Sequence, residues 1–305
     1  MGTCYTKYQE VRRFQKDRYG GGGLRPLLRD RALDLFSKGY RISGRLKKGL
    51  EEPRVQFIYL HHCFEDEVKG LRTLLETLKQ DHEFISYSRA VEMLLNGARI
   101  DRPYIAFSSD DGFRNNLKMA SVMEDLGARC CFFLVPELVG AKDPDFIEKT
   151  CAERFHFPPV EFMDGEDVKG LLENGHEIGS HSFSHPNMAG LSLEEGQREL
   201  RKGKEELEAA FGPVRHFAWP YGRFFHFRAE LAEASFEAGY RSCASAERGA
   251  HLPAANGSKP EELCIRRDHV ILDWPLDHTL FFLARNGIRV AEGKAANTFP
   301  YYGSE

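Results

Sequence analysis

Short apolar runs alternate along the chain with longer stretches in which apolar residues recur every three or four positions. The runs have the length of buried strands and are bounded by turn residues, and the longer stretches have the spacing of amphipathic helices. The runs predict strands at 55–60, 84–86, 104–109, 129–135, 176–179, 214–219 and 240–243. The stretches between them predict helices at 66–80, 87–97, 113–126, 167–173, 192–211 and 225–238. This alternation predicts an α/β fold built on a parallel sheet.

Two connections interrupt the alternation. Residues 140–165 are rich in charge, proline and aromatic side chains, and residues 247–262 in glycine, proline and alanine. Long connections in compact domains tend to be functional. We therefore expect 140–165 to be either a substrate-side lid or a packed surface insertion, and 247–262 to be an irregular loop.

The N-terminal part differs from the rest in charge. Residues 1–54 hold 14 Lys and Arg against 6 Asp and Glu, and the four glycines at 20–23 form a flexible linker. Residues 24–50 predict one or two basic helices. We expect a basic arm over 1–52 and a barrel over 53–305. The arm either covers the bottom of the barrel or makes a subunit contact, or it docks on anionic lipid or a phosphorylated substrate.

Polar clusters follow three of the predicted strands. Asp110 and Asp111 end the first, His181 and His185 follow the second, and Trp219-Pro220-Tyr221-Gly222 follows the third. In a parallel barrel the carboxyl ends of the strands meet at one face. Two histidines four residues apart and a carboxylate from elsewhere make a metal site with room for water.

These three motifs, in this order, resemble the polysaccharide deacetylase superfamily, and the resemblance extends from about Val55 to about Trp274. It implies a distorted (β/α) barrel with about seven parallel strands. It also implies that Asp111, His181 and His185 bind a divalent metal. Zinc is the default for this ligand set, while nickel, cobalt or iron would fit similar ligands.

The resemblance further implies catalytic roles. Asp110 corresponds to the general base, and the backbone N–H of Tyr221 to a donor for the oxyanion. Trp219, Pro220 and Tyr221 are expected to contact the substrate. Many members carry an arginine in the third motif that pairs with the catalytic aspartate, but this chain has Ala218 there. The subset with the Phe-Ala-aromatic-Pro-Tyr-Gly motif takes the arginine from a later strand, which here offers Arg267, in the better register, or Arg266.

The acid histidine also departs from the usual pattern, and Ser109 replaces a phenylalanine before the aspartate pair. Leu276-Asp277-His278 fits the usual C-terminal motif but begins an apolar, helix-like run, so we discount it. In the same subset the histidine comes from the first strand, where this chain has His61 and His62. We favour His62 because Phe64 then falls two residues later, where the subset has an apolar residue.

Composition limits the setting. A net charge of −4 gives no reason to expect a nucleic-acid partner, and no run of about 18 apolar residues predicts a membrane span. The seven cysteines are odd in number and include no Cys-x-x-Cys, which favours free thiols in a reducing compartment. Residues 1–15 lack the apolar segment of a secretory signal. We therefore expect a cytoplasmic protein, and the sequence predicts no particular oligomeric state.

The resemblance and the composition together predict an enzyme. It would hydrolyse the N-acetyl group of an amino sugar, and this sugar would be an intermediate of surface polysaccharide or lipopolysaccharide biosynthesis. The alternatives are a deformylase or another amide hydrolase on a lipid-linked sugar, an inactive carbohydrate-binding barrel, and a metal-binding structural partner in a glycan complex. A peripheral membrane contact through the basic arm stays open.

Overall fold

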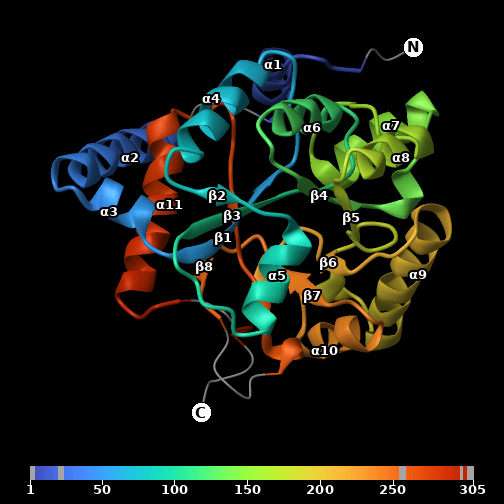
Figure 1. The fold of residues 1–305 in the computed structure, drawn as a ribbon. Coiled ribbons are helices and arrows are strands. Elements are labelled where there is room, and N and C mark those ends of the chain that lie inside the picture. The colour runs from blue at the N-terminus through green and yellow to red at the C-terminus, as the bar shows by residue number, and fades with distance from the viewer. Residues whose placement is uncertain (1–3, 20–23, 254–258, 296–297, 301–305) are drawn as a thin grey trace.

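A computed structural model of the chain describes residues 4–19, 24–253, 259–295 and 298–300 (Figure 1). Its sheet has the strand order β10-β1-β3-β4-β5-β6-β7-β9, and each pairing along this path is parallel. The strands are β1 (Arg54–Leu60), β3 (Pro103–Ser109), β4 (Cys130–Leu134), β5 (Glu177–Ser180), β6 (His216–Ala218), β7 (Ser242–Ala244), β9 (Cys264–Ile265) and β10 (Arg267–His269).

One segment, residues 264–269, links the two ends of the sheet. Its first part, β9, pairs with β7, and its second part, β10, pairs with β1 after a break at Arg266. Counting β9 and β10 as one, the sheet has seven parallel strand positions. The prediction of a distorted barrel with about seven parallel strands is therefore confirmed. Two short strands are added: β2 (Glu83–Phe84) pairs parallel with β3, and β8 (Ala250–His251) pairs antiparallel with β1.

Helices cover the outside of the sheet. They are α4 (Val68–Leu78), α5 (Tyr87–Leu95), α6 (Asn116–Asp125), α8 (Gly165–Glu173), α9 (Leu193–Phe211), α10 (Ala229–Glu237) and α11 (Leu276–Ala291). Each lies where the apolar spacing predicts a helix, apart from α11, of which only the apolar, helix-like start was noted. In α4, Leu71, Leu74, Leu75 and Leu78 are buried, so one face of the helix packs on the sheet.

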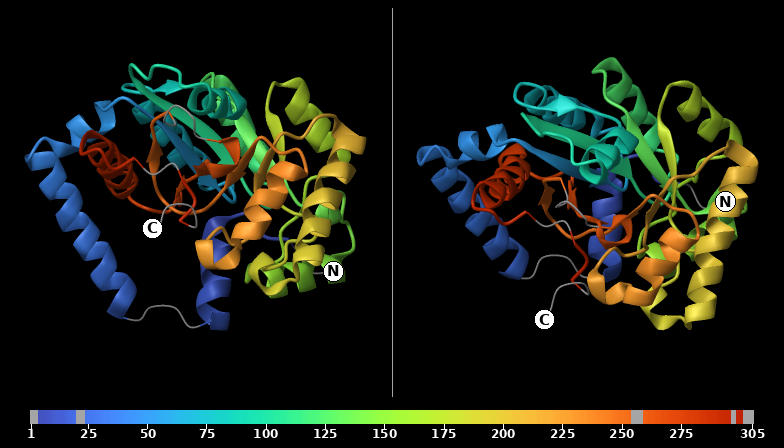
Figure 2. Two further views of the ribbon diagram at one scale, coloured as in Figure 1. Left: turned by 90° about the horizontal axis from the view of Figure 1, so that it is seen from below. Right: turned by 60° about the horizontal axis from the view of Figure 1, so that its bottom comes forward.

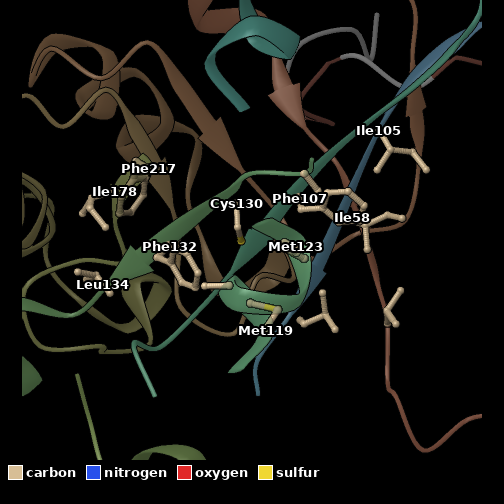
Figure 3. Close-up of a cluster of buried hydrophobic side chains, with 14 of the residues drawn as sticks. Ile58, Ile105, Phe107, Met119, Met123, Cys130, Phe132, Leu134, Ile178 and Phe217 are labelled. Carbon is tan, nitrogen blue, oxygen red and sulfur yellow. The ribbon is translucent and has the colours of Figure 1, made fainter. Parts of the chain in front are cut away.

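The core lies between the sheet and these helices. Figure 3 shows Ile58, Phe107 and Phe132 from neighbouring strands packed with Met119 and Met123 of α6. Alternate residues of the same strands point to the other face and form a second buried cluster inside the barrel, which includes Val55, Phe57, Ala106, Cys131, Phe133, Ala218 and Ile265. Burial on both faces explains why the strands read as continuous apolar runs.

The connection at 140–165 is a packed, partly helical insertion. It contains α7 (Pro144–Thr150) and a π-helical turn, η2 (Cys151–Phe155), and it follows the 3₁₀ turn η1 (Pro136–Leu138). Three more 3₁₀ turns are η3 (Met188–Gly190), η4 (Phe224–His226) and η5 (Pro260–Glu262). The insertion buries its apolar residues in a third cluster with Phe64 and Phe113.

The N-terminal part forms three helices: α1 (Tyr8–Tyr19), α2 (Leu24–Ile42) and α3 (Arg45–Glu51). Helix α1 was not predicted, since residues 1–19 show no clear core period, yet Val11 is fully buried in the third cluster. Helix α3 packs on α11 in backbone contact: a Cβ on Gly287 would lie 1.9 Å from the Gly49 carbonyl oxygen. Figure 2 shows α2 and α3 on the α11 side of the barrel, and α1 away from them.

Two further expectations can be compared with the structure. All seven cysteines are unpaired and six of them are buried, which confirms the prediction of free thiols. Among the residues that the structure describes, no helix combines the length and the apolar character needed to cross a bilayer.

Candidate active site

The three polar clusters meet in one cavity at the carboxyl ends of the strands. Asp110 and Asp111 directly follow β3, His181 directly follows β5, and Trp219 directly follows β6. The cavity has a volume of about 330 Å³, at the lower end of the range of small-molecule sites. Asp110, Asp111, His181, His185, Trp219 and Tyr221 all line it, together with both first-strand histidines, His61 and His62.

Asp111, His181 and His185 form a compact group of potential metal ligands. The Nε2 atoms of His181 and His185 lie 3.5 and 3.3 Å from Asp111 Oδ1, and all three side chains are buried. One ligand atom from each residue lies within 4.8 Å of the others. Two imidazole nitrogens and one carboxylate oxygen are the ligands of catalytic zinc sites that keep a position open.

Hydrogen bonding at the far side of one imidazole supports this use. His181 Nδ1–H donates to the Ala218 carbonyl oxygen at 2.7 Å, so the neutral ring turns the lone pair of Nε2 toward the Asp111 carboxylate. Two acceptors then face each other, an arrangement that a cation or a proton stabilises. If the two rings are protonated instead, their hydrogen bonds to the Asp111 carboxylate outweigh the effect of burial and hold the pKa of Asp111 well below its usual range. The residues therefore fit a divalent metal ion.

Backbone strain is concentrated around the same group. Among the described residues, the non-glycine residues with positive φ are Asp111, His156, Ser182, His185 and Tyr221, with φ between 50° and 73°. Four of them line the cavity, and Ser182 lies between the two histidine ligands. Such conformations cost about 1–3 kcal/mol each and persist only where the surroundings impose them. Their clustering is typical of a functional site.

Helix α9 holds the loop that carries the histidines. The Glu199 carboxylate accepts hydrogen bonds from the backbone N–H groups of Phe183 and Ser184, both at 2.9 Å. Gly203 lets the helix approach closely, since a Cβ there would lie 2.9 Å from the Ser182 carbonyl carbon. Glu199 was not predicted as a site residue, because this glutamate lies in a charged helix among other glutamates that face solvent.

Asp110 pairs with Arg267 inside the barrel. The Arg267 Nη1 and Nη2 atoms donate to Asp110 Oδ1 and Oδ2 at 2.7 and 2.9 Å, which is the contact predicted for Arg267 or Arg266. Arg266 lies instead over the Phe224 ring, with 5.0 Å between its Cζ atom and the ring centroid. Burial raises the pKa of Asp110, but the Arg267 guanidinium more than offsets this, so the pKa lies below its ordinary value.

His61 and His62 both reach the cavity but have different partners. His62 Nδ1 lies 3.2 Å from Glu67 Oε2, and its ring lies between those of Tyr8 and Phe157, with centroids 5.2 and 5.4 Å away. His61 Nδ1 lies 3.1 Å from Nε2 of His269. Burial lowers the pKa of His61, although Asp111 and Asp110 partly oppose this. His278 lies outside the cavity, as expected, and hydrogen-bonds Asp34.

The third motif lies beside the metal-ligand group. Tyr221 is 41% exposed, and its ring centroid lies 5.1 Å from that of His185. Trp219 is buried, stacks on Phe227 at 4.6 Å and donates its indole N–H to the Arg223 carbonyl oxygen. Pro220 is buried and is not among the residues that line the cavity. A direct substrate contact is thus available to Tyr221, whereas Trp219 lines the cavity but is 0% exposed.

The remaining wall comes from parts of the chain to which no site residue was assigned. Helix α1 contributes Tyr8 and Gln15, and the insertion contributes residues 154–157. The backbone N–H groups of Tyr8 and Gln9 donate to the Asp66 carboxylate at 2.7 and 3.1 Å. The insertion thus lies on the substrate side, as one of the two alternatives proposed. The spacing of Tyr8, Val11 and Gln15 could have indicated α1.

Helix α1 and the residues before it connect two walls of the cavity, the insertion at 140–165 and the segment that follows β10. At one end the Tyr5 backbone N–H donates to the Pro159 carbonyl oxygen at 3.1 Å, and further along Arg12 pairs with Asp273 at 3.1 Å. Residues 270–272, next to Asp273, line the cavity. The helix therefore closes the cavity on this side.

Comparison with known proteins agrees with the fold and the motifs. Residues 98–243 match the family model for polysaccharide deacetylase, a range that contains both metal motifs and Tyr221 but not His62 or Arg267. YxkH of Bacillus subtilis (strain 168) is 21% identical over 171 residues, which are 55% of this chain and 54% of that protein. The chitooligosaccharide deacetylase of Azorhizobium caulinodans is 41% identical over 51 residues, 16% of this chain and 24% of that protein. The chain thus spans about half of one relative and a quarter of the other.

A solved structure extends the similarity of fold. IcaB from Ammonifex degensii superimposes with a TM-score of 0.62 and 16% sequence identity, over 75% of this chain and 97% of that one. At this identity the likeness concerns the fold alone.

Proposed function

We propose that the chain hydrolyses the N-acetyl group of an amino sugar with the help of a divalent metal ion, and the match of residues 98–243 to the family model for polysaccharide deacetylase supports this proposal. The observation that carries the proposal is the proximity of two buried groups in one cavity: the ligand group Asp111, His181 and His185, and the Asp110–Arg267 pair. The first suits metal binding and the second suits proton transfer.

A divalent ion held by Asp111, His181 and His185 would supply Lewis-acid chemistry and lower the pKa of water in the site. Zinc is our first choice, and nickel, cobalt or iron would accept similar ligands. Asp110 accepts the proton of the attacking water. Its pair with Arg267 keeps it ionised, and each carboxylate oxygen retains a free lone pair for that proton. Base catalysis of this kind contributes about 10²–10⁴-fold.

We assign His62 as the acid that protonates the departing amine. Glu67 lies against its Nδ1 atom, and the stacked rings of Tyr8 and Phe157 help to hold its orientation in the cavity. The Nδ1 atom of His61 lies against another imidazole rather than a carboxylate, and burial lowers the pKa of His61. In the balanced reaction, water adds to the amide carbonyl, the C–N bond breaks, and the products are a carboxylic acid and the free amino sugar.

The Tyr221 backbone N–H is our candidate donor to the oxyanion that forms when the carbonyl is attacked. The positive φ of Tyr221, 61°, turns the chain sharply at the end of β6 beside His185. Removing one such donor typically costs about 3 kcal/mol of transition-state stabilisation. Trp219 and Tyr221 would position the sugar, with Pro220 shaping the turn.

The closed side of the cavity supports a small substrate. Helix α1 is attached to both Asp66 and Asp273. The middle of a long polymer could reach the cavity from this side only if these contacts were broken. A single amino sugar or a chain end fits better. We therefore propose an intermediate of surface polysaccharide or lipopolysaccharide assembly as the substrate. The unpaired cysteines support a reducing compartment, and we assign the activity to the cytoplasm.

Mass spectrometry tests the activity. The zinc-loaded chain is incubated with N-acetylated and N-formylated amino sugars, free and nucleotide-linked, with the chelated protein and Asp110→Asn as controls. Loss of an acetyl mass that depends on both metal and Asp110 is the expected result. Loss of a formyl mass alone would identify a deformylase. Sugar binding without any hydrolysis would identify an inactive carbohydrate-binding barrel.

A further inference from the structure

Large apolar side chains are exposed on one helix in particular. Of the seven exposed large hydrophobic residues in the described chain, four belong to α2: Leu28, Leu35, Phe36 and Ile42. Ile42 is 88% exposed and Leu35 is 70% exposed. Single exposed apolar side chains are ordinary on protein surfaces, whereas a contiguous group marks an interaction surface.

The exposed side chains follow one line along the helix. Leu28, Leu35 and Ile42 are seven residues apart, close to two helical turns, and the exposed residues Ala32 and Gly39 fall on the same line. We call Leu28, Ala32, Leu35, Gly39 and Ile42 the outer stripe. It is contiguous and lies on a single face.

The opposite face of α2 explains why the helix is there. Leu33 and Ser37 are buried, and Tyr40 packs edge-on against Phe281 of α11, with ring centroids 4.8 Å apart. Phe36, at the border, also stacks on Phe281. Attachment to α11 therefore uses the inner face and leaves the outer stripe to solvent.

Charges are distributed unevenly around the stripe. Arg31 and Lys38, again seven residues apart, are exposed along one edge. Both acidic residues of α2 are about half exposed and already paired: Asp34 accepts a hydrogen bond from His278 Nε2 at 2.7 Å, and Asp30 pairs with Arg29. The stripe is consequently apolar with a basic edge.

We propose that the outer stripe of α2 is a docking surface for an anionic lipid bilayer. An apolar face bordered by Arg and Lys is the pattern of helices that lie in the plane of a membrane interface. The apolar side chains would enter the acyl boundary, while Arg31 and Lys38 extend to the lipid phosphates. The basic balance of residues 1–54 adds attraction of the same sign.

A second copy of the chain is the competing occupant, and charge argues against it. A symmetric pairing brings the same patch of two copies together. Neither edge of the stripe presents an unpaired acidic residue to the basic edge of a partner, since Asp30 and Asp34 already pair with Arg29 and His278. Like charges would face each other across the contact, which disfavours association.

Docking would also orient the cavity. Helix α1, which closes the cavity, precedes α2 by the four residues 20–23, and both helices extend downward from the sheet in the left view of Figure 2. A sugar carried on a lipid would then meet the cavity near the membrane. This consequence rests on the proposed function, whereas the docking itself does not.

Vesicle co-sedimentation of the full metal-loaded chain tests the docking. We expect binding to vesicles of equal parts phosphatidylcholine and phosphatidylglycerol, and much weaker binding to phosphatidylcholine alone. Leu35→Glu should weaken binding by about tenfold or more, since it removes a buried leucine from the interface. Leu193→Glu, an exposed leucine at the start of α9, is the matched control and should bind as wild type does.

A charge variant distinguishes attraction by the basic edge of the stripe from attraction by the net charge of the whole chain. Arg31→Glu/Lys38→Glu should weaken binding by about 25-fold or more, because each basic residue near an anionic surface contributes roughly fivefold. Arg198→Glu/Arg201→Glu makes the same charge change on exposed positions of α9 and should have far less effect. Equal losses in the two double variants would overturn the proposal in favour of general attraction.

Two other outcomes would also overturn the proposal. One is a wild-type chain that stays in solution with anionic vesicles. The other is a dimer, detected by light scattering, that Leu35→Glu converts into a monomer, since the stripe would then be an interface between copies. Hydrolysis of a free N-acetyl sugar should be unchanged in Leu35→Glu, so failure of the enzymatic proposal would be seen separately from failure of the docking.

Discussion

Replacing Arg267 by methionine should both destabilise the protein and shift its pH dependence. Arg267 and Asp110 are both buried and share two hydrogen bonds of 2.7 and 2.9 Å. The substitution keeps most of the side-chain volume and leaves the Asp110 carboxylate without its cation. Arg266→Met is the matched control, because Arg266 has the same chemistry one position earlier and lies over Phe224, away from Asp110.

The structure sets the size of the effect. Breaking a buried ion pair by removing one partner costs about 3–5 kcal/mol, because an uncompensated charge stays behind. Arg267 also donates to the Ser245 carbonyl oxygen at 2.9 Å and to Ser108 Oγ at 3.2 Å, so further polar atoms lose their partner. We expect the upper part of that range, against a total stability of about 5–15 kcal/mol for a typical domain. The control should lose about 1 kcal/mol or less.

The sign of the pH dependence follows from the pKa of Asp110. In the native chain Arg267 holds this pKa below its unfolded value, so the ionised carboxylate adds stability above the unfolded pKa, about 3.9. That stability is lost as the pH falls through the folded pKa. In Arg267→Met the guanidinium no longer opposes burial, so the pKa of Asp110 rises even though His181 and His61 still lower it, and the carboxyl group is accommodated more readily when protonated. The stability gap between the two proteins should widen as the pH rises from about 4 toward neutral, because the carboxyl group of the variant then loses its proton, and it should narrow as the pH falls through the folded pKa of the native Asp110.

Urea unfolding in the presence of a chelator, followed by circular dichroism at a series of pH values, measures this gap. In the metal-loaded enzyme the acid limb of the pH profile of kcat/KM should move upward by about 1–3 pH units. Arg267→Lys keeps the positive charge but cannot donate two parallel hydrogen bonds to the carboxylate, so its stability should lie between those of the wild type and Arg267→Met. The reasoning is refuted if Arg267→Met is as stable as Arg266→Met at neutral pH, or if the gap does not change with pH.

Four further predictions concern the site. Asp111→Ala removes one of three metal ligands and should lose metal and activity together, and an undiminished metal content by plasma mass spectrometry would contradict the ligand assignment. Asp110→Asn should retain the metal but lose about 10²–10⁴-fold in turnover, and normal turnover would place the base elsewhere. His62→Gln should lower kcat more than His61→Gln does, and the reverse order in steady-state kinetics would exchange the two roles. Tyr8→Ala opens the α1 side of the cavity, so the ratio of kcat/KM for an N-acetylated oligosaccharide to that for a single sugar should rise; an unchanged ratio would show that this wall does not limit substrate length.

The fold class followed from local patterns. Apolar runs bounded by turn residues predicted six of the seven parallel strand positions, and the helical spacing between them predicted six of the helices outside the barrel. Burial on both faces of a strand or on one face of a helix is directly visible as a pattern of apolar residues. The segment 264–269 was not among the predicted runs and was expected only from the family resemblance. The motifs that end β3 and β5 were visible for a similar reason. Asp110 lies next to Asp111, and His181 lies close to His185 in sequence. The metal-ligand group could therefore be predicted once the ends of the parallel strands were expected to meet.

Other parts of the site depended on contacts between distant segments. Whether Arg267 or Arg266 faces Asp110 is decided by the pairing of β10 with β1, since a shift of one residue turns a strand side chain to the opposite face. Glu199 and Tyr8 act through long-range contacts, and nothing in their own neighbourhood distinguishes them from surface residues. The division of the chain at residues 52 and 53 stays a prediction.

The sequence alone determined the α/β class, because that depends on local spacing, and its resemblance to the deacetylase family supplied the barrel and the metal-ligand and base candidates. The tertiary structure decided which arginine pairs with Asp110, which partner orients His62, and that α1 closes the cavity. Those contacts join residues far apart in sequence, and only register and packing bring them within hydrogen-bond distance.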